Sequence, residues 1–370
     1  MPKDQFDSPP GMGYRESGED PLKRPQLPPT VYVPPRSTPG PRIGRWRIAA
    51  AVGVLTATAG LIATATIRVS DDGDQYTYRT SRSIPVGTDP FGIGLRAEAH
   101  RLYVANSQDN SMTIIDTSSQ SVLKTVAVGH TPNAVGVSAN SGVVYVPNWK
   151  DNTVSVLDGG GNPIDLVEVD RAPYGIAVDD ARARVFVTNS GSNSVSVIDA
   201  HTNSVTTAIG VGGTPNTIAL DEINRRAYVA NCAGSISVIN VDTLHVEMTF
   251  PTSENTCEAA IDPKSALLHT ANYETGEVTT YAAATGTRVR GAAYGNSTSD
   301  PIQLTINTAS NALIISVGSK LIIIDSPTGE IRSETMIGDG AFGSPTVDQE
   351  LHRIYLPNGK SNSVMVLDRE

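Results

Sequence analysis

The sequence predicts an all-β fold built from repeated four-stranded sheets, and three observations lead to this prediction. A phrase recurs between residues 101 and 368: an apolar run that ends in asparagine, followed about ten residues later by a second apolar run that ends in Asp or Asn. Its asparagines are spaced 41 or 42 residues apart, except for a last interval of 86 that corresponds to two steps. Within each run the apolar residues alternate, as they do in strands. The asparagines are Asn106, Asn148, Asn189, Asn231, Asn272 and Asn358.

A strand-forming repeat of about 42 residues indicates a β-propeller, in which each repeat forms one blade. The long interval contains a degenerate copy, with residues 313–318 and 321–325 as its two strands. A second phrase, the lead-in, begins each unit sixteen residues before its asparagine. Clear lead-ins start at Pro90, Pro132, Pro173 and Pro215, and looser ones at Thr256, Pro301 and Phe342. Seven lead-ins and seven strand pairs predict a seven-bladed β-propeller.

Each unit divides into four strands, as the third unit illustrates. We expect its inner strand at 175–179, its second at 184–188, its third at 195–199 and its outer strand at 204–210. The hairpin between the second and third strands carries Asn or Gly in nearly every unit. These residues tolerate the left-handed conformation that tight turns require. They are Asn110, Asn152, Asn193, Gly234, Gly276 and Asn362.

The seventh unit reaches residue 370 directly after its third strand, so it lacks an outer strand of its own. Residues 76–87 precede the first lead-in and are similar to the outer strand at 121–129. We therefore expect this N-terminal strand to complete the last blade. The two ends of the propeller would then meet in one sheet and leave no open edge in the ring.

The Tyr-Val-Ala-Asn phrase at 103–106 and the Gly-Thr-Pro lead-in at 213–215 resemble the YVTN-type (YncE-like) family of bacterial β-propellers, within the WD40/YVTN-like repeat superfamily. The resemblance spans residues 76–370. It implies a seven-bladed propeller in an exported or surface-exposed bacterial protein, and it implies no particular chemistry because the shared motifs are structural. The lead-in at 255–258 and the sixth unit depart from the family pattern.

Residues 1–47 differ in composition from the repeats. Eleven of the 24 prolines lie before residue 43, and aliphatic residues are few, so we expect a disordered cytoplasmic tail. Residues 25–28 read Pro-Gln-Leu-Pro, a spacing that polyproline-binding modules recognise and that proline-rich tails also produce by chance.

Residues 48–67 carry no charge over twenty positions, the length that spans a bilayer, and are expected to form a transmembrane helix. Basic residues precede this segment, and acidic residues follow it in a linker at 68–75. The positive-inside rule then predicts a single-pass cell-membrane protein with a cytoplasmic N-terminus and an extracytoplasmic propeller. The long tail favours an uncleaved signal-anchor. Cleavage after the small residues at 63–65 stays open as the alternative.

The net charge of the propeller argues against nucleic acid as a binding partner. The tail has eight basic and five acidic residues, which leaves 20 basic and 33 acidic residues for the remainder of a chain with net charge −10. An acidic propeller is poorly suited to nucleic acid, whose binding depends on neutralising phosphates. We expect no nucleic-acid partner.

The two cysteines, Cys232 and Cys257, lie in loops of neighbouring units that emerge on the same face. In an exported domain this favours a disulfide, with two free thiols as the alternative. Neither cysteine belongs to a zinc or haem pattern, and the six histidines fall in different loops and strands. We therefore expect no metal site and no cofactor, and we name no catalytic residue.

A candidate ligand-binding face lies where the lead-ins and hairpin turns crowd one mouth of the channel. Trp149 and Tyr273 follow repeat asparagines at the position where units 1 and 3 have serine, so they are either exposed anchors for a ligand or packing residues over the next blade. Glu258 and Gln303 replace small lead-in residues, and they either point into the channel or are solvated. The candidates are Asp89, Phe91, Asn133, Trp149, Tyr174, Asn216, Glu258, Tyr273 and Gln303.

Two classes of function remain. We favour a binding or scaffold module of the cell envelope that recognises a protein, peptide or glycan on the loop face. The alternative is an enzyme of lactonase or lyase type, which similar propellers host through a metal at the channel mouth. Such a site needs converging ligands, and the sequence offers only Asp89, Glu258 and Asp300 as scattered candidates.

Overall fold

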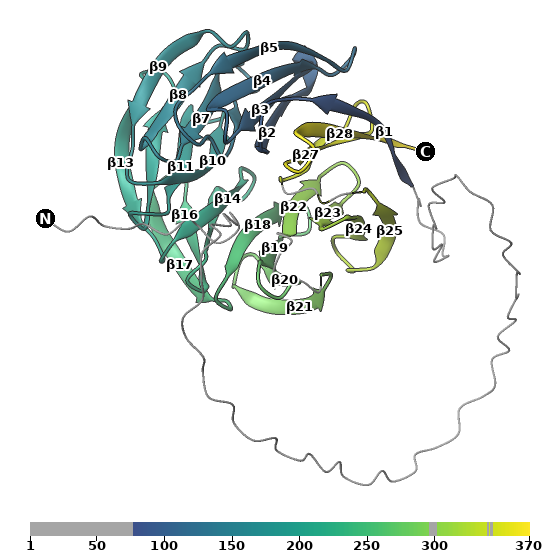
Figure 1. Cartoon of the computed structure of the whole chain (residues 1–370). Coiled ribbons are helices and arrows are strands. Elements are labelled where there is room, and N and C mark those ends of the chain that lie inside the picture. Colours follow the sequence, from purple (N-terminus) through teal and green to yellow (C-terminus); the bar gives the residue numbers. More distant parts are fainter. Residues whose placement is uncertain (1–76, 296–301, 339, 341–342) are drawn as a thin grey trace, which may run out of the picture. The chain divides into compact units, whose positions relative to one another are not determined.

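The computed structural model describes residues 77–295, 302–338, 340 and 343–370. These residues form seven antiparallel sheets of four strands each. Figure 1 shows the sheets arranged as blades around a common centre. The prediction of an all-β, seven-bladed propeller is confirmed. The expected tail (1–47), transmembrane helix (48–67) and linker (68–75) lie outside the described residues, among which no helix is long and apolar enough to cross a membrane.

The strands follow the repeat in sequence order. Blade 1 contains β2 (Pro90–Arg96), β3 (Arg101–Asn106), β4 (Ser111–Asp116) and β5 (Ser121–Ala127), with the short 3-10 helix η1 (Ala97–Ala99) after β2. Blade 2 contains β6 (Gly136–Val137), β7 (Val144–Asn148), β8 (Thr153–Leu157) and β9 (Pro163–Glu168). Blade 3 contains β10 (Pro173–Asp179), β11 (Arg184–Asn189), β12 (Ser194–Asp199) and β13 (Ser204–Gly210). Blade 4 contains β14 (Pro215–Asp221), β15 (Arg226–Asn231), β16 (Ser235–Asn240) and β17 (His245–Pro251).

The remaining blades include the degenerate unit and the closing strand. Blade 5 contains β18 (Thr256–Asp262), β19 (Leu267–Asn272), β20 (Glu277–Ala282) and β21 (Thr287–Ala293). Blade 6 contains β22 (Ile302–Asn307), β23 (Ala312–Val317), β24 (Lys320–Asp325) and β25 (Ile331–Met336). Blade 7 contains β26 (Thr346–Asp348), β27 (Arg353–Asn358), β28 (Ser363–Arg369) and β1 (Tyr78–Pro85). The strands expected for the third unit match β10–β13 to within two residues at each end.

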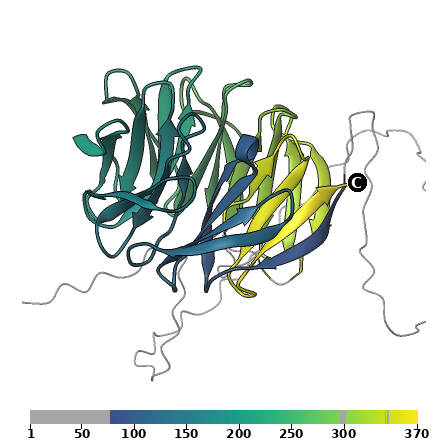
Figure 2. The same cartoon turned by 90° about the horizontal axis from the view of Figure 1, so that it is seen from above.

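The propeller closes as expected. β1 pairs antiparallel with β28, from Tyr78 opposite Arg369 to Pro85 opposite Ser363. Figures 1 and 2 show these two strands, dark blue and yellow, side by side in one blade. An N-terminal strand thus completes the last blade.

The recurrent Asn and Tyr have structural roles. In blade 3 the buried Asn189 donates hydrogen bonds from Nδ2 to Ser194 Oγ (3.1 Å) and Ser196 Oγ (2.9 Å), which ties the second strand to the start of the third. The same pattern recurs in blades 1, 2 and 4. The hydroxyl of the buried Tyr103 reaches the next blade and donates to the carbonyl of Gly159 (3.0 Å). The phrase therefore specifies blades and their contacts.

The hairpin turns also follow the prediction. The Asn or Gly expected to be left-handed has a positive φ in six of the hairpins, with φ 52° at Asn110 and φ 100° at Gly234. The set comprises Asn110, Asn152, Asn193, Gly234, Gly276 and Asn362.

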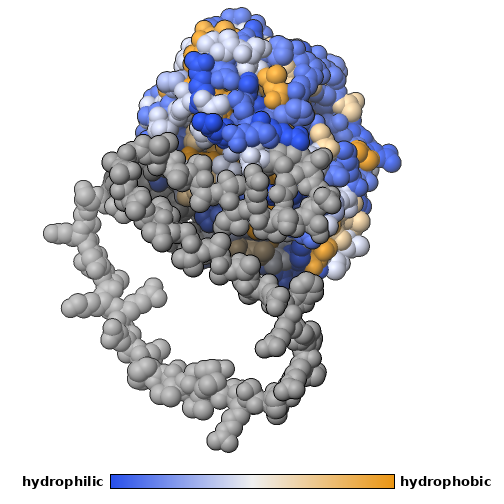
Figure 3. Space-filling view, turned by 90° about the vertical axis from the view of Figure 1, so that its right-hand side faces the viewer, coloured by the Kyte–Doolittle hydropathy of each residue, from blue (hydrophilic) through white to orange (hydrophobic). Residues whose placement is uncertain are grey.

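The core lies between the blades. Among the described residues, seven clusters of buried apolar side chains each join one blade to the next, including one between blades 7 and 1. The outer strands contribute little to these clusters; β5 is exposed along nearly its whole length. On the face drawn in Figure 3, hydrophobic residues form separate patches among hydrophilic ones. Since the blades are stabilised at their mutual contacts, the centre of the ring is free to carry other chemistry.

Candidate functional site at the channel mouth

A cavity of about 300 Å³ lies at the centre of the ring, and we call it the channel cavity. Every blade contributes to its wall through its lead-in. Four of the residues expected at the channel mouth line it, and three further residues complete the circle. Its wall includes, in blade order, Phe91, Asn133, Tyr174, Thr217, Glu258, Leu304 and Ser344.

Bulges at the start of the inner strands set which side chains face the cavity. In blades 1, 3 and 4 the lead-in proline pairs with the repeat asparagine, and the register then shifts before the next pairing three residues later. In blade 5 the shift falls between Thr256 and Glu258, which leaves Cys257 as the extra residue. A bulge redirects neighbouring side chains and often lies beside a binding site.

Glu258 is the main polar group in the wall. Its side chain is 3% exposed, and its Oε1 accepts a hydrogen bond from the hydroxyl of Tyr273 (2.9 Å). Gln303 Nε2 donates to the same hydroxyl (3.1 Å), and Ser344 Oγ donates to Gln303 Oε1 (2.5 Å). This chain of hydrogen bonds runs through blades 5, 6 and 7. Within the described part of the protein no cation forms an ion pair with Glu258.

Burial has the largest effect on the pKa of the Glu258 carboxyl. Removal from water raises the pKa of its carboxyl to about 8, and the hydrogen bond from Tyr273 opposes this rise only in part. The carboxyl is therefore mostly protonated at neutral pH. In that state it donates a hydrogen bond as well as accepting one.

Two aromatic rings also belong to the wall. Phe91 and Tyr174 meet edge to face, with ring centroids 6.2 Å apart and an interplanar angle of 72°. Burial raises the pKa of the Tyr174 hydroxyl, and the nearby carboxyls of Glu258 and Asp89 raise it further. Asp89 immediately precedes β2, and burial also raises the pKa of its carboxyl. Tyr174 thus contacts the other ring, and its hydroxyl is within electrostatic range of both carboxyls.

Two asparagines near the mouth have polar atoms without partners among the described residues. Asn133 is 1% exposed, and neither its Nδ2 nor its Oδ1 has a hydrogen-bond partner there. Asn216 is 2% exposed; its Nδ2 donates to Cys232 Sγ (3.5 Å), but its Oδ1 is unpaired. A buried, unpaired amide costs stability, because it has given up water without gaining a hydrogen bond.

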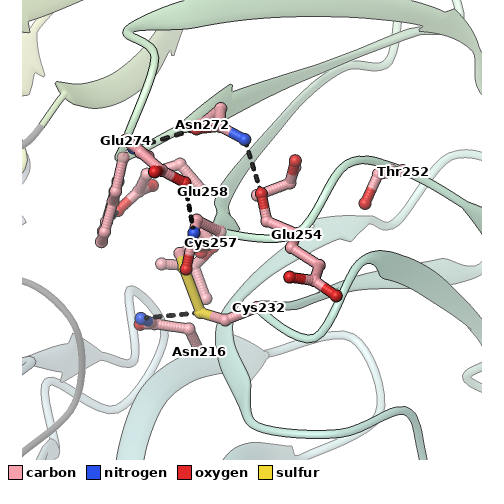
Figure 4. The surroundings of a disulfide bond; sticks show 12 residues. Asn216, Cys232, Thr252, Glu254, Cys257, Glu258, Asn272 and Glu274 are labelled. Carbon is pink, nitrogen blue, oxygen red and sulfur yellow. Dashed lines mark hydrogen bonds between the residues drawn. A yellow bond between two sulfur atoms is a disulfide. The ribbon is translucent and has the colours of Figure 1, made fainter. Parts of the chain in front are cut away.

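A disulfide joins Cys232 and Cys257, as the sequence favoured, and the alternative of two free thiols is wrong. Cys232 follows β15 and Cys257 is the bulge residue of β18, so the bond ties blade 4 to blade 5. Figure 4 shows the disulfide with Asn216 at one sulfur and Glu258 next to Cys257. The bulge that presents Glu258 is therefore covalently held.

Several candidate residues do not lie as expected. Tyr273 is 8% exposed and packs in the cluster between blades 5 and 6, so the expectation of an exposed anchor is wrong and packing over the next blade is correct. Glu258 and Gln303 are buried, so the solvated interpretation is wrong for both. Trp149 is half-buried and is not part of the cavity wall.

Thr217 and Ser344 also line the cavity and were not among the residues predicted from the sequence. Thr217 Oγ1 donates to the carbonyl of Cys257 (2.9 Å) and accepts from the amide of Ala259 (3.0 Å), which links blade 4 to the bulge of blade 5. Both residues occupy the third position of the lead-in, two residues after its start, and the pattern at this position was the available signal. That position is small in blades 1 to 3 and polar in blades 4 to 7: Gly92, Ala134, Gly175, Thr217, Glu258, Gln303 and Ser344.

A second buried polar cluster lies between blades 5 and 6. His269 is fully buried; its Nδ1 lies 3.0 Å from Thr280 Oγ1, and its Nε2 lies 2.9 Å from Ser326 Oγ. Ser326 in turn donates to Asp262 Oδ2 (2.6 Å). None of these residues belongs to the wall of the channel cavity, so we assign the cluster to blade contact.

The carboxylates proposed for a metal do not converge where the structure describes them. Among residues 77–295, 302–338, 340 and 343–370, no three His, Cys, Asp or Glu side chains are grouped closely enough to hold one ion. Asp300 lies outside the described residues.

Comparisons with known proteins bear on the fold. No protein-family model matches the chain, and no curated protein matches it. Among solved structures, hydrazine synthase of Kuenenia stuttgartiensis is similar, with a TM-score of 0.67 and 18% sequence identity. The match covers 78% of this chain and 98% of that one. At such low identity the likeness concerns the propeller fold alone.

Proposed function

We propose that the protein is a YVTN-type propeller, anchored in the cell membrane by residues 48–67, that acts as an extracytoplasmic binding module of the bacterial cell envelope. Its ligand enters the channel cavity. The observation that carries this proposal is Glu258, a buried carboxyl without a counter-ion in the wall of that cavity. The repeat phrases support the family, and the uncharged segment at 48–67 supports the anchor.

The blade does not require a glutamate at this position. Blades 1 to 3 have Gly92, Ala134 and Gly175 there, so the fold accepts a residue with little or no side chain. A buried carboxyl costs free energy unless it is paired, and among the described residues Glu258 has the hydrogen bond from Tyr273 but no counter-ion. Asn133 adds an amide without a hydrogen-bond partner among those residues to the same wall. Polar groups that converge on a cavity and lack internal partners are typical of ligand sites.

The size of the cavity limits what enters. A volume of about 300 Å³ is at the lower end of the range for small-molecule sites. A protein, peptide or glycan partner would therefore insert one side chain, a chain end or a single sugar residue. The rest of such a partner would lie on the loop face around the mouth.

The test is a thermal-shift screen of the full-length protein against peptides, glycan fragments and small metabolites. Ligands of the cavity should bind at least about tenfold more weakly to Glu258→Gln and Asn133→Leu, since each substitution removes a polar contact worth more than about 1.4 kcal/mol. The matched control is Glu168→Gln, on the exposed outer strand β9. If every ligand binds all variants equally, the cavity is not the binding site.

One observation favours an enzyme as the second candidate. A carboxyl with a pKa of about 8 beside the Tyr273 hydroxyl is suited to act as a general acid at neutral pH. A lyase-type activity would then depend on Glu258. Chemical conversion of a bound ligand by the wild type, absent in Glu258→Gln despite retained binding, would favour this candidate over a pure binding module.

A further inference from the structure

We propose that the channel cavity recognises organic cations, and that its ligand places an ammonium group between the Glu258 carboxyl and the rings of Phe91 and Tyr174. This inference rests on the proposed function and names the chemical class of the ligand. Three properties of the wall lead to it: its charge, its aromatic surface and its unpaired hydrogen-bond acceptor.

The charge of the wall favours cations over anions. Among the described residues that line the wall, none is Lys, Arg or His, and the only titratable ones are Tyr174 and Glu258. Asp89 lies close enough to Tyr174 to influence its hydroxyl, which adds a second acidic group near the mouth. An anionic ligand would meet no positive partner, whereas a cation would meet at least one carboxyl.

The aromatic pair gives the cavity a surface for a weakly hydrated cation. Ring faces carry partial negative charge and attract ammonium groups, most strongly where water is excluded. Phe91 and Tyr174 both belong to the wall and contact each other edge to face. The same Tyr174 lies near Glu258, so rings and carboxyl act on one region of the cavity.

The amide of Asn133 completes the arrangement. Its Oδ1 is buried in the wall and accepts no hydrogen bond from the described residues. A primary ammonium would donate to this oxygen and to Glu258. A quaternary ammonium would use the rings and the carboxylate charge alone.

Binding of a cation should release a proton. In the unliganded cavity the Glu258 carboxyl keeps its proton at neutral pH, because burial raises its pKa to about 8. A cation nearby stabilises the carboxylate and lowers that pKa, so the proton leaves to solvent as the ion pair forms. Of the acidic groups around it, Tyr273 donates to the carboxylate, Tyr174 stays neutral because its pKa is raised, and Asp89 adds to the attraction. Affinity should therefore rise with pH by up to about tenfold per unit below pH 8.

The experiment is calorimetric titration of the full-length protein with three probes. Choline and ethanolamine supply a quaternary and a primary ammonium, and 3,3-dimethylbutan-1-ol has the shape of choline without its charge. Titrations at pH 6, 7 and 8 in two buffers of different ionisation enthalpy count the protons released. We expect a cation to bind at least about tenfold more tightly than the neutral alcohol and to release up to one proton.

Variants separate the contributions of the wall. Glu258→Gln should weaken cation binding and abolish both its pH dependence and its proton release. Phe91→Leu should weaken binding but leave the number of protons unchanged, which a general loss of structure would not do. Glu168→Gln should behave as the wild type.

The outcomes distinguish this inference from the proposed function. If neither cation binds at millimolar concentration, or if the neutral alcohol binds as tightly as choline, the cation inference is wrong. The binding function survives that result if a neutral or anionic ligand from the screen loses affinity in Asn133→Leu. It fails only if no ligand of any class depends on the cavity residues.

Discussion

At the scale of single residues, Glu258 and Asn133 are buried polar residues that the propeller fold does not require. Both are almost fully buried in the wall of the cavity; among the described residues Glu258 has no counter-ion, and the Asn133 amide has no hydrogen-bond partner. The repeat asparagines are equally buried but donate to two hydroxyls each in blades 1 to 4, as Asn189 does. Buried polarity therefore serves two purposes in this protein, and mutational effects on stability should separate them.

Glu258→Gln should remove a pH dependence of stability. The folded-state pKa of about 8 lies above the ordinary glutamate pKa of 4.5, so the contribution of Glu258 is fully present below pH 4.5 and is lost as pH rises through 8. By linkage the loss approaches about 4 kcal/mol at pH 8. Urea unfolding at pH 5 and pH 8 measures it. The glutamine variant should be more stable than the wild type at pH 8, and indistinguishable pH profiles would contradict the assignment.

Asn133→Leu and Asn189→Leu should have opposite effects on the free energy of unfolding. The first removes an amide without partners, so the free energy of unfolding should rise by about 1 kcal/mol. The second removes two donated hydrogen bonds, so it should fall by about 2 kcal/mol, although Asn189 Oδ1 is itself unpaired. Denaturant titration of both variants measures the two signs. A loss of stability in both would mean that Asn133 supports the fold.

At the scale of elements, the contacts between strands carry the stability of the ring. β1 is joined to β28 along almost its full length and gives blade 7 its outer strand. The cluster around His269 joins blades 5 and 6 through satisfied hydrogen bonds. From the first contact we predict an effect on the cooperativity of unfolding. From the second we predict an effect on the stability of the protein at low pH.

Deleting residues 1–82 should abolish cooperative unfolding, since it removes most of β1 and exposes the edge of β28. A deletion of residues 1–75 keeps β1 whole and is the matched control. Differential scanning calorimetry should show one sharp transition for the control and a broad or absent one for the longer deletion. Equal transitions in both would show that the ring does not depend on this strand.

His269 should destabilise the protein in acid. Burial lowers its pKa from 6.5 to about 4, with Arg290 acting in the same direction and Asp262 opposing. The contribution of His269 is therefore complete above pH 6.5 and is lost as pH falls through 4, by about 3 kcal/mol. Urea unfolding between pH 7 and pH 4 should show a shallower loss in His269→Asn than in the wild type. The same substitution at the exposed His201 should leave the slope unchanged.

At the scale of the whole molecule, the fold could be predicted from the sequence and the site only in part. A period of about 42 residues gave the blades, the turns and the closing strand, because each repeat copies the same local contacts. The direction of Glu258 was not readable, since it depends on the register shift at Cys257, and a shift of one residue moves a side chain to the other face. The burial of Tyr273 involves residues of another blade, including Gln303, which donates to its hydroxyl.

The proposed anchor makes a prediction for the intact chain. Protein purified from membranes should have the mass of the full sequence if 48–67 is an uncleaved signal-anchor. Intact-mass spectrometry decides this directly. A mass that begins near residue 66 would show instead that the segment is a cleaved signal.

The pairing of β1 with β28 also orders events in time. β1 is synthesised before the strands of blades 1 to 6, and its partner β28 is synthesised after all of them, with Tyr78 opposite Arg369. Blade 7 therefore cannot form until the strands of all the other blades have been synthesised, whereas blades 1 to 6 are each built from consecutive strands. Contacts between residues so far apart in sequence form slowly, and unpaired strands invite association with other chains. The pairing that closes the ring in the folded protein therefore leaves β1 unpaired during synthesis, and the chain is most prone to associate with other chains in that interval.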